Sequence, residues 1–320
     1  MRSLCNQEYP SELFEIIIVD DGSTDKTWDL ISGFYHPEKE ICSLRLEDIS
    51  EGKFSAYKKR AIFSGIGVSH NDVIVTTDAD CLHPPEWLKT LDAFYRATNA
   101  ALTVAPVTYS FRPSVLEMFQ ALDFLILQGI TGASVFKNIH SMCNGANLAY
   151  EKNAFEDVQG FEGIDHVASG DDMLLMYKIS KKFPKRIKYL KSKNATVTTP
   201  AMTTWKDFFN QRIRWSSKAR FYDDKRIFWT LLLVYLFNLS FLALLIAAIW
   251  HVKFLFWVLI LWIAKTLVEF PFVNAVATYF NKRSLLNFFF FFQPLHVAYT
   301  IIAGWLGQFK KYEWKGRKIV

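Results

Sequence analysis

The sequence has little that would build a disulfide-bonded or zinc-stabilised scaffold. Four of its 320 residues are cysteines, and they are far apart with no CxxC pair: Cys5, Cys42, Cys81 and Cys143. This spacing predicts neither a disulfide framework nor a zinc site, and it favours a reducing compartment. Polar residues rather than an apolar stretch follow Met1, so we expect no secretory signal peptide.

Two other sequence features are absent, and their absence argues against particular classes of protein. The N-terminal region has no glycine-rich basic loop of the kind with which nucleotidyltransferases bind a triphosphate, and the chain has no internal repeat. The net charge is +6 and the pI about 9.0, but the Lys and Arg residues cluster beside apolar runs. That arrangement suits an anionic membrane surface better than nucleic acid. We therefore expect membrane lipids, and no nucleic acid, among the partners.

The most informative stretch that is present is Val73–Cys81, where a β-branched apolar run leads to Asp78 and Asp80. The run predicts a buried strand, and its carboxylates then lie at the C-terminal end, where open α/β sheets bind ligands. Two hard oxygen ligands at that position can hold Mg²⁺ or Mn²⁺ against a diphosphate. The alternative is a strand followed by an ordinary Asx-type turn.

A second predicted strand ends in the same way. The apolar residues 14–19 are followed by Asp20 and Asp21, and a helix is expected over about 26–34. An Asp carboxylate at this strand end can accept a hydrogen bond from the imide N–H of a uracil. The alternative is a plain strand–turn–helix in which the aspartates only form the turn.

Together, Ile18–Asp25 (IVDDGSTD) and Thr77–Asp80 (TDAD) resemble the family 2 glycosyltransferases of the GT-A fold, which transfer a sugar from a nucleotide donor that is usually UDP-linked. The resemblance implies an α/β catalytic domain, Rossmann-like with a mixed sheet. It also implies that Asp21 contacts the nucleoside. Asp78 and Asp80 would bind the donor and the divalent metal, with Asp80 the main metal ligand.

The segment Glu51–Lys53, with a helix after it to Ile66, resembles the family's Gly-Lys segment. The resemblance places Lys53 near the donor, whereas a solvated surface lysine is the alternative. The family often has Leu-Asn where this chain has Lys58 and Lys59, so the similarity is partial at this point.

Two later segments resemble the acceptor side of the family's site. In Cys143–Tyr150, Gly145 and Asn147 match a Gly-x-Asn segment, although an ordinary turn into a strand has the same residues. Ser169–Asp172 opens a helix, and the second acid of the family's corresponding pair is the general base. The resemblance therefore assigns to Asp172 the deprotonation of the acceptor hydroxyl. The alternative is an acid that only complements the helix dipole.

Gln211, Arg214 and Trp215 are spaced i, i+3, i+4 and so share one helix face. Arg can grip a phosphate with its planar fork, and Trp offers an apolar face to a sugar. A juxtamembrane helix with a snorkelling Arg is the alternative. The spacing resembles the Gln-x-x-Arg-Trp motif of membrane-bound family members. That resemblance implies donor contact for Arg214 and acceptor contact for Gln211 and Trp215.

Residues 115–136 are apolar except for a polar stripe formed by Glu117, Gln120 and Asp123. This pattern predicts an amphipathic helix that lies on a membrane or packs on the sheet rather than a membrane span.

The C-terminal third predicts about three membrane spans, at 227–250, 254–279 and 288–309. Lys265 and Glu269 lie inside the second span, where a charge at the bilayer centre costs roughly 2.5–3.5 kcal/mol. We therefore expect both residues to face the interior of the helix bundle. They would serve there as a structural pair or as part of a conduit for the acceptor.

We expect a GT-A-like domain with interfacial helices over residues 1–226, a transmembrane region over 227–309 and a basic tail over 310–320. Basic residues before the first span place the catalytic domain in the cytoplasm. We expect a multi-pass integral protein of a bacterial inner membrane. Three spans would leave the basic tail outside, against the positive-inside tendency. If 254–279 were instead a re-entrant or interfacial element, the tail would return inside, but Lys282 and Arg283 would then lie outside.

The family's opening strand, which ends in Pro-x-(Arg/Tyr)-Asn-Glu, has no counterpart in this sequence, so the resemblance implies a domain without that strand. The expected function is inverting transfer, of the hexosyltransferase type, from a nucleotide sugar to a glycan or lipid acceptor, with synthase subunits as further partners. The alternatives are a catalytically inactive, truncated membrane subunit that scaffolds a glycan synthase, and a nucleotidyltransferase that uses the Asp pair.

Overall fold

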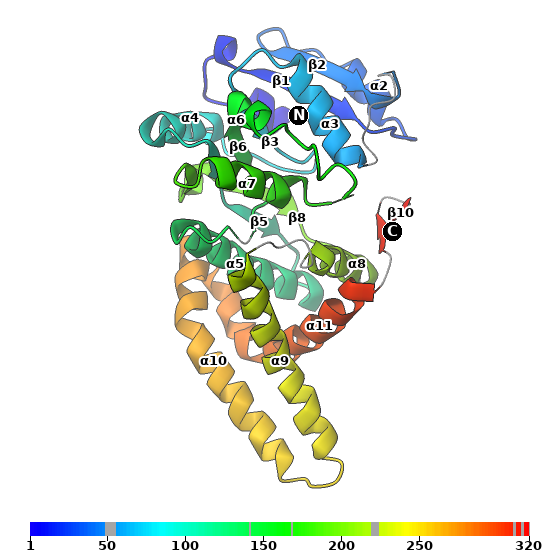
Figure 1. Cartoon of the computed structure of the whole chain (residues 1–320), viewed down its shortest axis with the longest axis vertical. Coiled ribbons are helices and arrows are strands. Elements are labelled where there is room, and N and C mark those ends of the chain that lie inside the picture. The colour runs from blue at the N-terminus through cyan, green and yellow to red at the C-terminus, as the bar shows by residue number, and fades with distance from the viewer. Residues whose placement is uncertain are drawn as a thin grey trace. The chain divides into compact units, whose positions relative to one another are not determined.

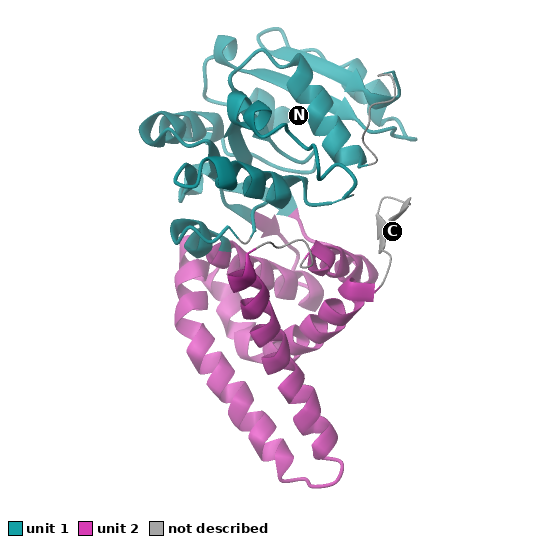
Figure 2. Cartoon of the chain, in the orientation of Figure 1, with its two compact units in different colours: residues 1–107, 131–199 teal, residues 108–130, 200–320 magenta. Residues whose placement is uncertain are grey.

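The computed structural model describes residues 1–48, 56–140, 142–167, 169–218 and 224–309, and the backbone of 312–314 and 317–319. The chain splits into two compact units (Figure 2). Unit 1 comprises residues 1–107 and 131–199, and unit 2 comprises residues 108–130 and 200–320. This division differs from the predicted boundary at residue 226, because polar side chains of 115–130 and 200–218 are bonded to one another and to the C-terminal helices.

In unit 1, helices and strands alternate along the chain (Figure 1). Its strands are β1 Glu15–Asp20, β2 Glu40–Arg45, β3 Val73–Thr76, β4 Leu102–Val104, β6 Leu148–Glu151 and β7 Ile187–Tyr189. Its helices are α1 Arg2–Cys5, α2 Thr27–Ser32, α3 Tyr57–Val68, α4 Trp87–Thr98, α6 Lys152–Asp157 and α7 Asp171–Lys182. Short 3₁₀ turns lie at Ser11–Leu13, Leu46–Asp48 and Lys193–Ala195. In the sequence, the chain passes between the units within β5 Val107–Ser110, α5 Val115–Phe136 and β8 Val197–Pro200.

The strands of unit 1 form a mixed arrangement. Strands β1 and β2 are parallel, with Glu15 opposite Glu40, and α2 lies between them in the chain. A second sheet has the order β3-β6-β4-β7, in which β6 is antiparallel to both neighbours and β4 is parallel to β7. This arrangement confirms the predicted mixed α/β class.

The core of unit 1 lies around the second sheet and α7. Leu102, Leu148 and Ile187 of three strands are buried together with Leu175 and Ile179 of α7. Strand β4 is buried at every position, as expected for a strand covered on both faces. The C-terminal end of β3 is therefore held against a packed core, which fixes the position of the residues that follow it.

Unit 2 consists mainly of helices. They are the first part of α5, then α8 Trp205–Ser216, α9 Lys225–Ala247, α10 Phe254–Tyr279 and α11 Phe289–Phe309, the last preceded by a 3₁₀ segment at Arg283–Phe288. Short strands β9 Tyr312–Trp314 and β10 Arg317–Ile319 pair at the C-terminal end. Among the described residues, four helical stretches are long and apolar enough to cross a membrane: Val115–Phe136, Lys225–Ala247, Phe254–Tyr279 and Arg283–Phe309.

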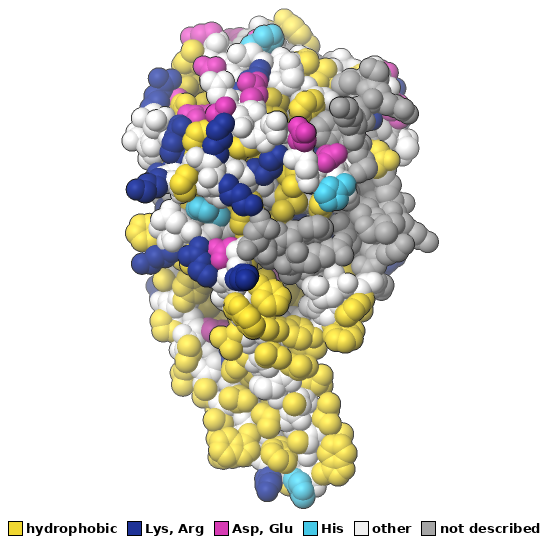
Figure 3. All heavy atoms as spheres, in the orientation of Figure 1, with side chains coloured by type: hydrophobic (Ala, Val, Ile, Leu, Met, Phe, Trp, Pro, Cys, Tyr) yellow, Lys and Arg dark blue, Asp and Glu magenta, His cyan; other side chains and the backbone are white. Residues whose placement is uncertain are grey.

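The four stretches differ in how much protein covers them. The most apolar window of α5 is 56% buried, against 11% for α9 and for α10. Hydrophobic side chains gather on the surface of α9 and α10 (Figure 3). The most exposed of them include Leu233 of α9 and Leu267 and Val268 of α10. Apolar surface of this extent is typical of helices that face lipid.

The polar stripe of α5 is buried. Glu117 accepts hydrogen bonds from the Arg112 backbone and guanidinium, at 2.7 and 3.0 Å. Gln120 exchanges two hydrogen bonds with the Met202 backbone, at 2.8 and 3.1 Å. Asp123 forms an ion pair with Arg212 of α8. The stripe therefore serves contacts inside unit 2.

Candidate functional site

One lysine lies among carboxylates from two separate segments of unit 1. The Lys58 Nζ of α3 donates a hydrogen bond of 2.9 Å to Asp78, just beyond β3, and lies 3.4 Å from Asp171. Burial alone would lower the pKa of Lys58, but the carboxylates of Asp171, Asp78 and Asp172 raise it well above its ordinary value. Lys58 is therefore a permanent cation in an acidic cluster.

The helix start at α7 positions the third carboxylate. Gly170 precedes the helix with a φ of +79°, a conformation that glycine adopts at no steric cost. Asp172 accepts hydrogen bonds from the backbone N–H groups of Met173 at 2.7 Å and Gly145 at 3.2 Å. A Cβ at Gly145 would lie 3.2 Å from the Asp171 Oδ2, so any other residue there would push Asp171 away by a few tenths of an ångström. The structure thus brings together the predicted residues Asp78, Gly145 and Asp172.

Asn147 lies in the same segment, but its side chain is used inside the protein. It is fully buried, and its amide nitrogen donates to the carbonyl oxygens of Pro106 at 2.8 Å and Ala195 at 2.7 Å. Its amide oxygen accepts a hydrogen bond of 3.0 Å from the Trp87 indole. Asn147 thus anchors the segment that carries Gly145.

The two aspartates after β1 have different environments. Asp20 is buried and accepts hydrogen bonds from the backbone and hydroxyl of Ser23, so it forms the turn. Asp21 is partly exposed on this turn, and Gly22 follows it with a φ of +73°. The turn interpretation therefore fits Asp20, and Asp21 is the residue that a ligand can reach.

After β3, Asp80 is exposed, whereas its neighbour Cys81 is buried. Burial, with the charges of Asp78 and Asp80, raises the pKa of the Cys81 thiol to about 11. Burial lowers the pKa of His83 to about 4, and its ring bonds to the hydroxyls of Thr77 and Ser3 at 2.7 and 3.0 Å. The Cys81 thiol and the His83 imidazole are therefore both neutral at pH 7.

Sequence reasoning missed the two lysines of α3 as site residues. Lys53 lies outside the described residues. Lys58 pairs with the acids, and the buried Lys59 donates to the carbonyl oxygens of Ile164, Val167 and Ser169, in the segment before α7. The sequence contained one indication of this role, because Lys58 and Lys59 stand where the family often has Leu-Asn.

In unit 2, the residues of the Gln211–Trp215 segment lie on α8. Gln211 accepts a hydrogen bond of 3.3 Å from the Tyr109 hydroxyl, and Arg214 is partly buried. The segment's other arginine, Arg212, was not predicted as a functional residue. It is 3% exposed, pairs with Asp123 at 2.8 Å and lies 4.3 Å over the Trp215 ring. Arg212 therefore forms part of the interior of unit 2, whereas the Trp215 ring over it stays partly exposed.

A further group of potential metal ligands lies elsewhere in unit 1. Ligand atoms of Glu15, Glu40 and His70 lie within 4.8 Å of one another. Glu15 already accepts hydrogen bonds from His70 and Asn71. This group is at the start of β1 and β2, so it lies at the opposite end of β1 from Asp20.

Comparison with known proteins gives a family match. The Glycosyl transferase family 2 model matches residues 1–159. The "Probable glycosyltransferase YdaM" of Bacillus subtilis is 25% identical over 222 residues, which cover 68% of this chain and 50% of that protein. The "Undecaprenyl-phosphate 4-deoxy-4-formamido-L-arabinose transferase" of Photorhabdus laumondii is 36% identical over 86 residues, 27% of this chain and 25% of that one.

Among solved structures, residues 1–349 of S. aureus TarS in complex with UDP-GlcNAc align with 99% of this chain and 90% of that one. The TM-score is 0.46 and the sequence identity 15%. The glycosyltransferase AglE of Haloferax volcanii is 24% identical over 54% of this chain and 53% of that protein. The chain thus spans about half the length of the first curated relatives that it matches.

Proposed function

Residues 1–159 belong to glycosyl transferase family 2, and on this premise we propose that the chain transfers a sugar from a UDP-sugar to a lipid or lipid-linked glycan acceptor at a membrane. The transfer inverts the anomeric carbon in a single displacement. The observation that carries the proposal is the convergence of Asp78, Lys58 and Asp172 from three segments of unit 1.

Asp172 is the general base in this proposal. Its carboxylate accepts hydrogen bonds from the backbone N–H groups of Gly145 and Met173, which fix its orientation. An ionised, fixed carboxylate can take the proton of an acceptor hydroxyl as that oxygen attacks the anomeric carbon. Gly145 allows the acceptor to approach closely because it adds no side chain, and Asn147 holds that segment in place.

The donor is bound by groups at the two strand ends. The Asp21 carboxylate accepts the imide N–H of the uracil. Lys58 offers a positive charge next to Asp78, where the diphosphate would lie, and Lys53 and Arg214 are further cations for the phosphates. A fixed positive charge at a leaving diphosphate stabilises the charge that develops there.

Asp78 and Asp80 fit a divalent metal in their donor chemistry. Carboxylate oxygens are the ligands that Mg²⁺ and Mn²⁺ prefer, and diphosphate oxygens commonly complete such sites. Asp80 is exposed and Asp78 half-buried, so both can be reached from solvent. When bound, the ion would neutralise the leaving diphosphate.

The acceptor is a membrane lipid or is linked to one. The apolar surfaces of α9 and α10 support a membrane location, and we propose that these helices span a bacterial inner membrane with unit 1 in the cytoplasm. The Photorhabdus relative carries undecaprenyl phosphate in its name. Gln211 and Trp215 are proposed to face the acceptor, and synthase subunits are proposed as further partners.

The test is UDP release in membranes that carry the full chain, with a panel of UDP-sugars and Mg²⁺ or Mn²⁺. Asp172→Asn removes the base but keeps the shape, and a general base contributes about 10²–10⁴-fold. UDP release should fall by about that factor. Asp157→Asn is the matched control, because Asp157 lies at the end of α6, half-exposed and paired with Lys182.

Equal release by Asp172→Asn and the unaltered chain would contradict the assignment of the base. Absence of both UDP release and UDP binding would contradict the transferase itself and support the inactive membrane subunit. Release of pyrophosphate from a nucleoside triphosphate, without UDP release, would support the nucleotidyltransferase.

A further inference from the structure

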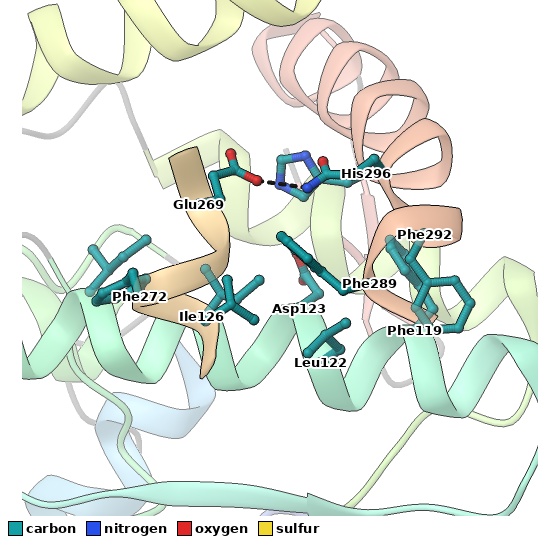
Figure 4. A pocket seen from close by; sticks show the side chains of 12 residues that line it. Phe119, Leu122, Asp123, Ile126, Glu269, Phe272, Phe289, Phe292 and His296 are labelled. Atoms are coloured by element: carbon teal, nitrogen blue, oxygen red, sulfur yellow. Dashed lines mark hydrogen bonds between the residues drawn. The ribbon is translucent and has the colours of Figure 1, made fainter. Parts of the chain in front are cut away.

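A cavity of about 220 Å³ lies within unit 2, among α5, α10 and α11 (Figure 4). Most of its wall is apolar and is formed by Phe119, Leu122, Ile126, Ile130, Phe272, Val273, Phe289 and Phe292. The rest is formed by Asp123, Glu269, Gln293 and His296. A dry cavity of about 150 Å³ is enough to bind benzene, so this one can hold a longer piece of hydrocarbon.

The polar part of the wall presents carboxylates, whereas their cations lie behind it. Glu269 and Asp123 line the cavity, but Lys265 and Arg212 are not among its lining residues. Lys265 lies 2.8 Å from Glu269 and donates to Gln293 at 2.5 Å. Arg212 lies 2.8 Å from Asp123. The two carboxylates and the two cations sum to zero net charge, so this network needs no charged ligand to balance it.

This charge arrangement restricts what can enter. A phosphate inside the cavity would meet two carboxylates before it met a cation, and like charges at short distance repel strongly where water is scarce. An uncharged chain meets no such repulsion, and the phenylalanine and aliphatic side chains offer it contact on several sides. The wall therefore favours the hydrocarbon part of a lipid over its anionic headgroup.

The cavity is also open to its surroundings. Ile130 and Phe272, both lining residues, remain 40% and 39% exposed. They lie on helices that are apolar enough to cross a membrane. In a bilayer, the neighbouring medium would be lipid chains, so a chain can enter without leaving an apolar environment.

We propose that this cavity holds a segment of the hydrocarbon chain of the lipid acceptor and leaves the anionic headgroup outside. The identity of the occupant as the acceptor rests on the proposed function. The chain segment would tether the acceptor to unit 2 during transfer.

The experiment uses two photoreactive probes in membranes that carry the full chain. One is a polyprenyl phosphate with a diazirine in its chain, and the other has the diazirine beside the phosphate. After irradiation, labelled peptides are identified by mass spectrometry. The chain probe should label peptides of α5, α10 and α11 that line the cavity, and the headgroup probe should label them at least fivefold less.

A variant that fills the cavity tests whether labelling by the chain probe depends on this cavity. Ile126→Trp places a large side chain in the cavity and should reduce labelling by the chain probe at least fivefold. Leu233→Trp is the control, since Leu233 is 70% exposed on α9 and does not line the cavity. Ile130→Trp is a second filling variant at a more exposed position, for the case that Ile126→Trp does not fold.

Unchanged labelling in both filling variants, or equal labelling of the cavity by the headgroup probe, would overturn the proposal. Sugar transfer to the probe is measured in the same membranes. Transfer without labelling of the cavity would overturn the proposal and leave the proposed function standing. Labelling without transfer would support the cavity as a chain site and contradict the proposed function.

Discussion

Lys58 and Asp78 form an ion pair of 2.9 Å beyond the end of β3, and this pair places a positive charge between acids that would otherwise repel one another. Asp171 lies 3.4 Å from the same Nζ atom. A lysine at this position serves two purposes in the proposed reaction. It keeps the carboxylates close together, and it offers a charge to the donor diphosphate.

The first prediction concerns this lysine. Lys58→Gln keeps the length of the side chain approximately but removes its charge. We expect the KM for the UDP-sugar to rise roughly tenfold, which corresponds to about 1.4 kcal/mol of lost binding. Steady-state kinetics in membranes measure the change. Lys89→Gln, at an exposed position of α4, should leave the KM unchanged. An unaltered KM in Lys58→Gln would mean that Lys58 only balances the charge of the acids.

The second prediction concerns the glycine beside Asp172. In Gly145→Ala, the new Cβ would lie 3.2 Å from Asp171 Oδ2, so Asp171 must shift by a few tenths of an ångström, whereas Lys58 Nζ at 3.5 Å stays in ordinary contact. Asp171 precedes the proposed base Asp172 in α7, so its shift moves the base as well, and a 1 Å misplacement of a catalytic group can cost about 10²-fold in rate. We expect kcat to fall by roughly ten- to hundredfold.

The control for this substitution is Gly67→Ala in α3, where nothing lies within 4 Å of the new Cβ. This substitution should leave kcat unchanged and raise the melting temperature slightly, because alanine is the better helix former. Equal kcat values for the two variants would show that the approach of Gly145 to the acids does not matter for catalysis.

The strand ends could be predicted from the sequence, because an apolar run that stops at a carboxylate marks the end of a strand. The predicted 14–19 is observed as Glu15–Asp20, and the stretch before Asp78 is observed as Val73–Thr76. The residues that pair with these acids could not be predicted. Lys58 and Lys59 are adjacent, and about 100° separates neighbours on a helix. Which of them reaches the acids depends on how α3 packs.

The same limit applies to α8. Arg212 and Arg214 are two positions apart and so point to nearly opposite sides of the helix. A resemblance to a motif selects Arg214, whereas the contact with Asp123 singles out Arg212 as the buried arginine. The contact joins residues 89 positions apart in the chain (212 − 123), so local periodicity carries no information about it. The sequence predicts the polar stripe of α5, but the burial of the stripe depends on partners such as Met202 and Arg212, which are far away in the chain.

The third prediction concerns the metal. Asp80→Asn replaces an exposed carboxylate by a neutral amide, which is a weaker ligand for a hard cation. We expect the Mg²⁺ or Mn²⁺ concentration for half-maximal UDP release to rise about tenfold or more. A titration of UDP release against metal measures it, with Asp48→Asn, in the 3₁₀ turn after β2, as the control. Full activity in a chelator would contradict the metal requirement.

The fourth prediction concerns pH. Burial lowers the pKa of Lys282 to about 8, although its Nζ donates to Thr108 at 2.8 Å and to the Tyr109 carbonyl. Between pH 8 and the ordinary pKa of about 10.4, the unfolded chain therefore holds the proton more tightly than the folded one. Stability from this group rises with pH across that window. The melting temperature of the full chain minus that of Lys282→Met should increase from pH 8 to pH 10. A difference in melting temperature that stays constant with pH would contradict the lowered pKa of Lys282.

The fifth prediction compares a buried ion pair with an exposed one. Arg212 and Asp123 are 3% and 4% exposed, and removal of one partner leaves a buried charge without its counter-ion. Such a change costs about 3–5 kcal/mol. In a chain of this size, that cost lowers the melting temperature by roughly 5–15 °C. We therefore expect Arg212→Met to melt lower by that amount in detergent.

The exposed pair of Arg96 and Asp92 is the matched control. The Arg96 side chain is 70% exposed, so Arg96→Met should change stability by less than about 1 kcal/mol. The double variant Arg212→Met with Asp123→Leu should recover part of the loss, because it removes both charges of the pair. A double variant less stable than Arg212→Met would show that Asp123 contributes mainly through its hydrogen bond from Tyr299, at 2.7 Å, rather than through the arginine.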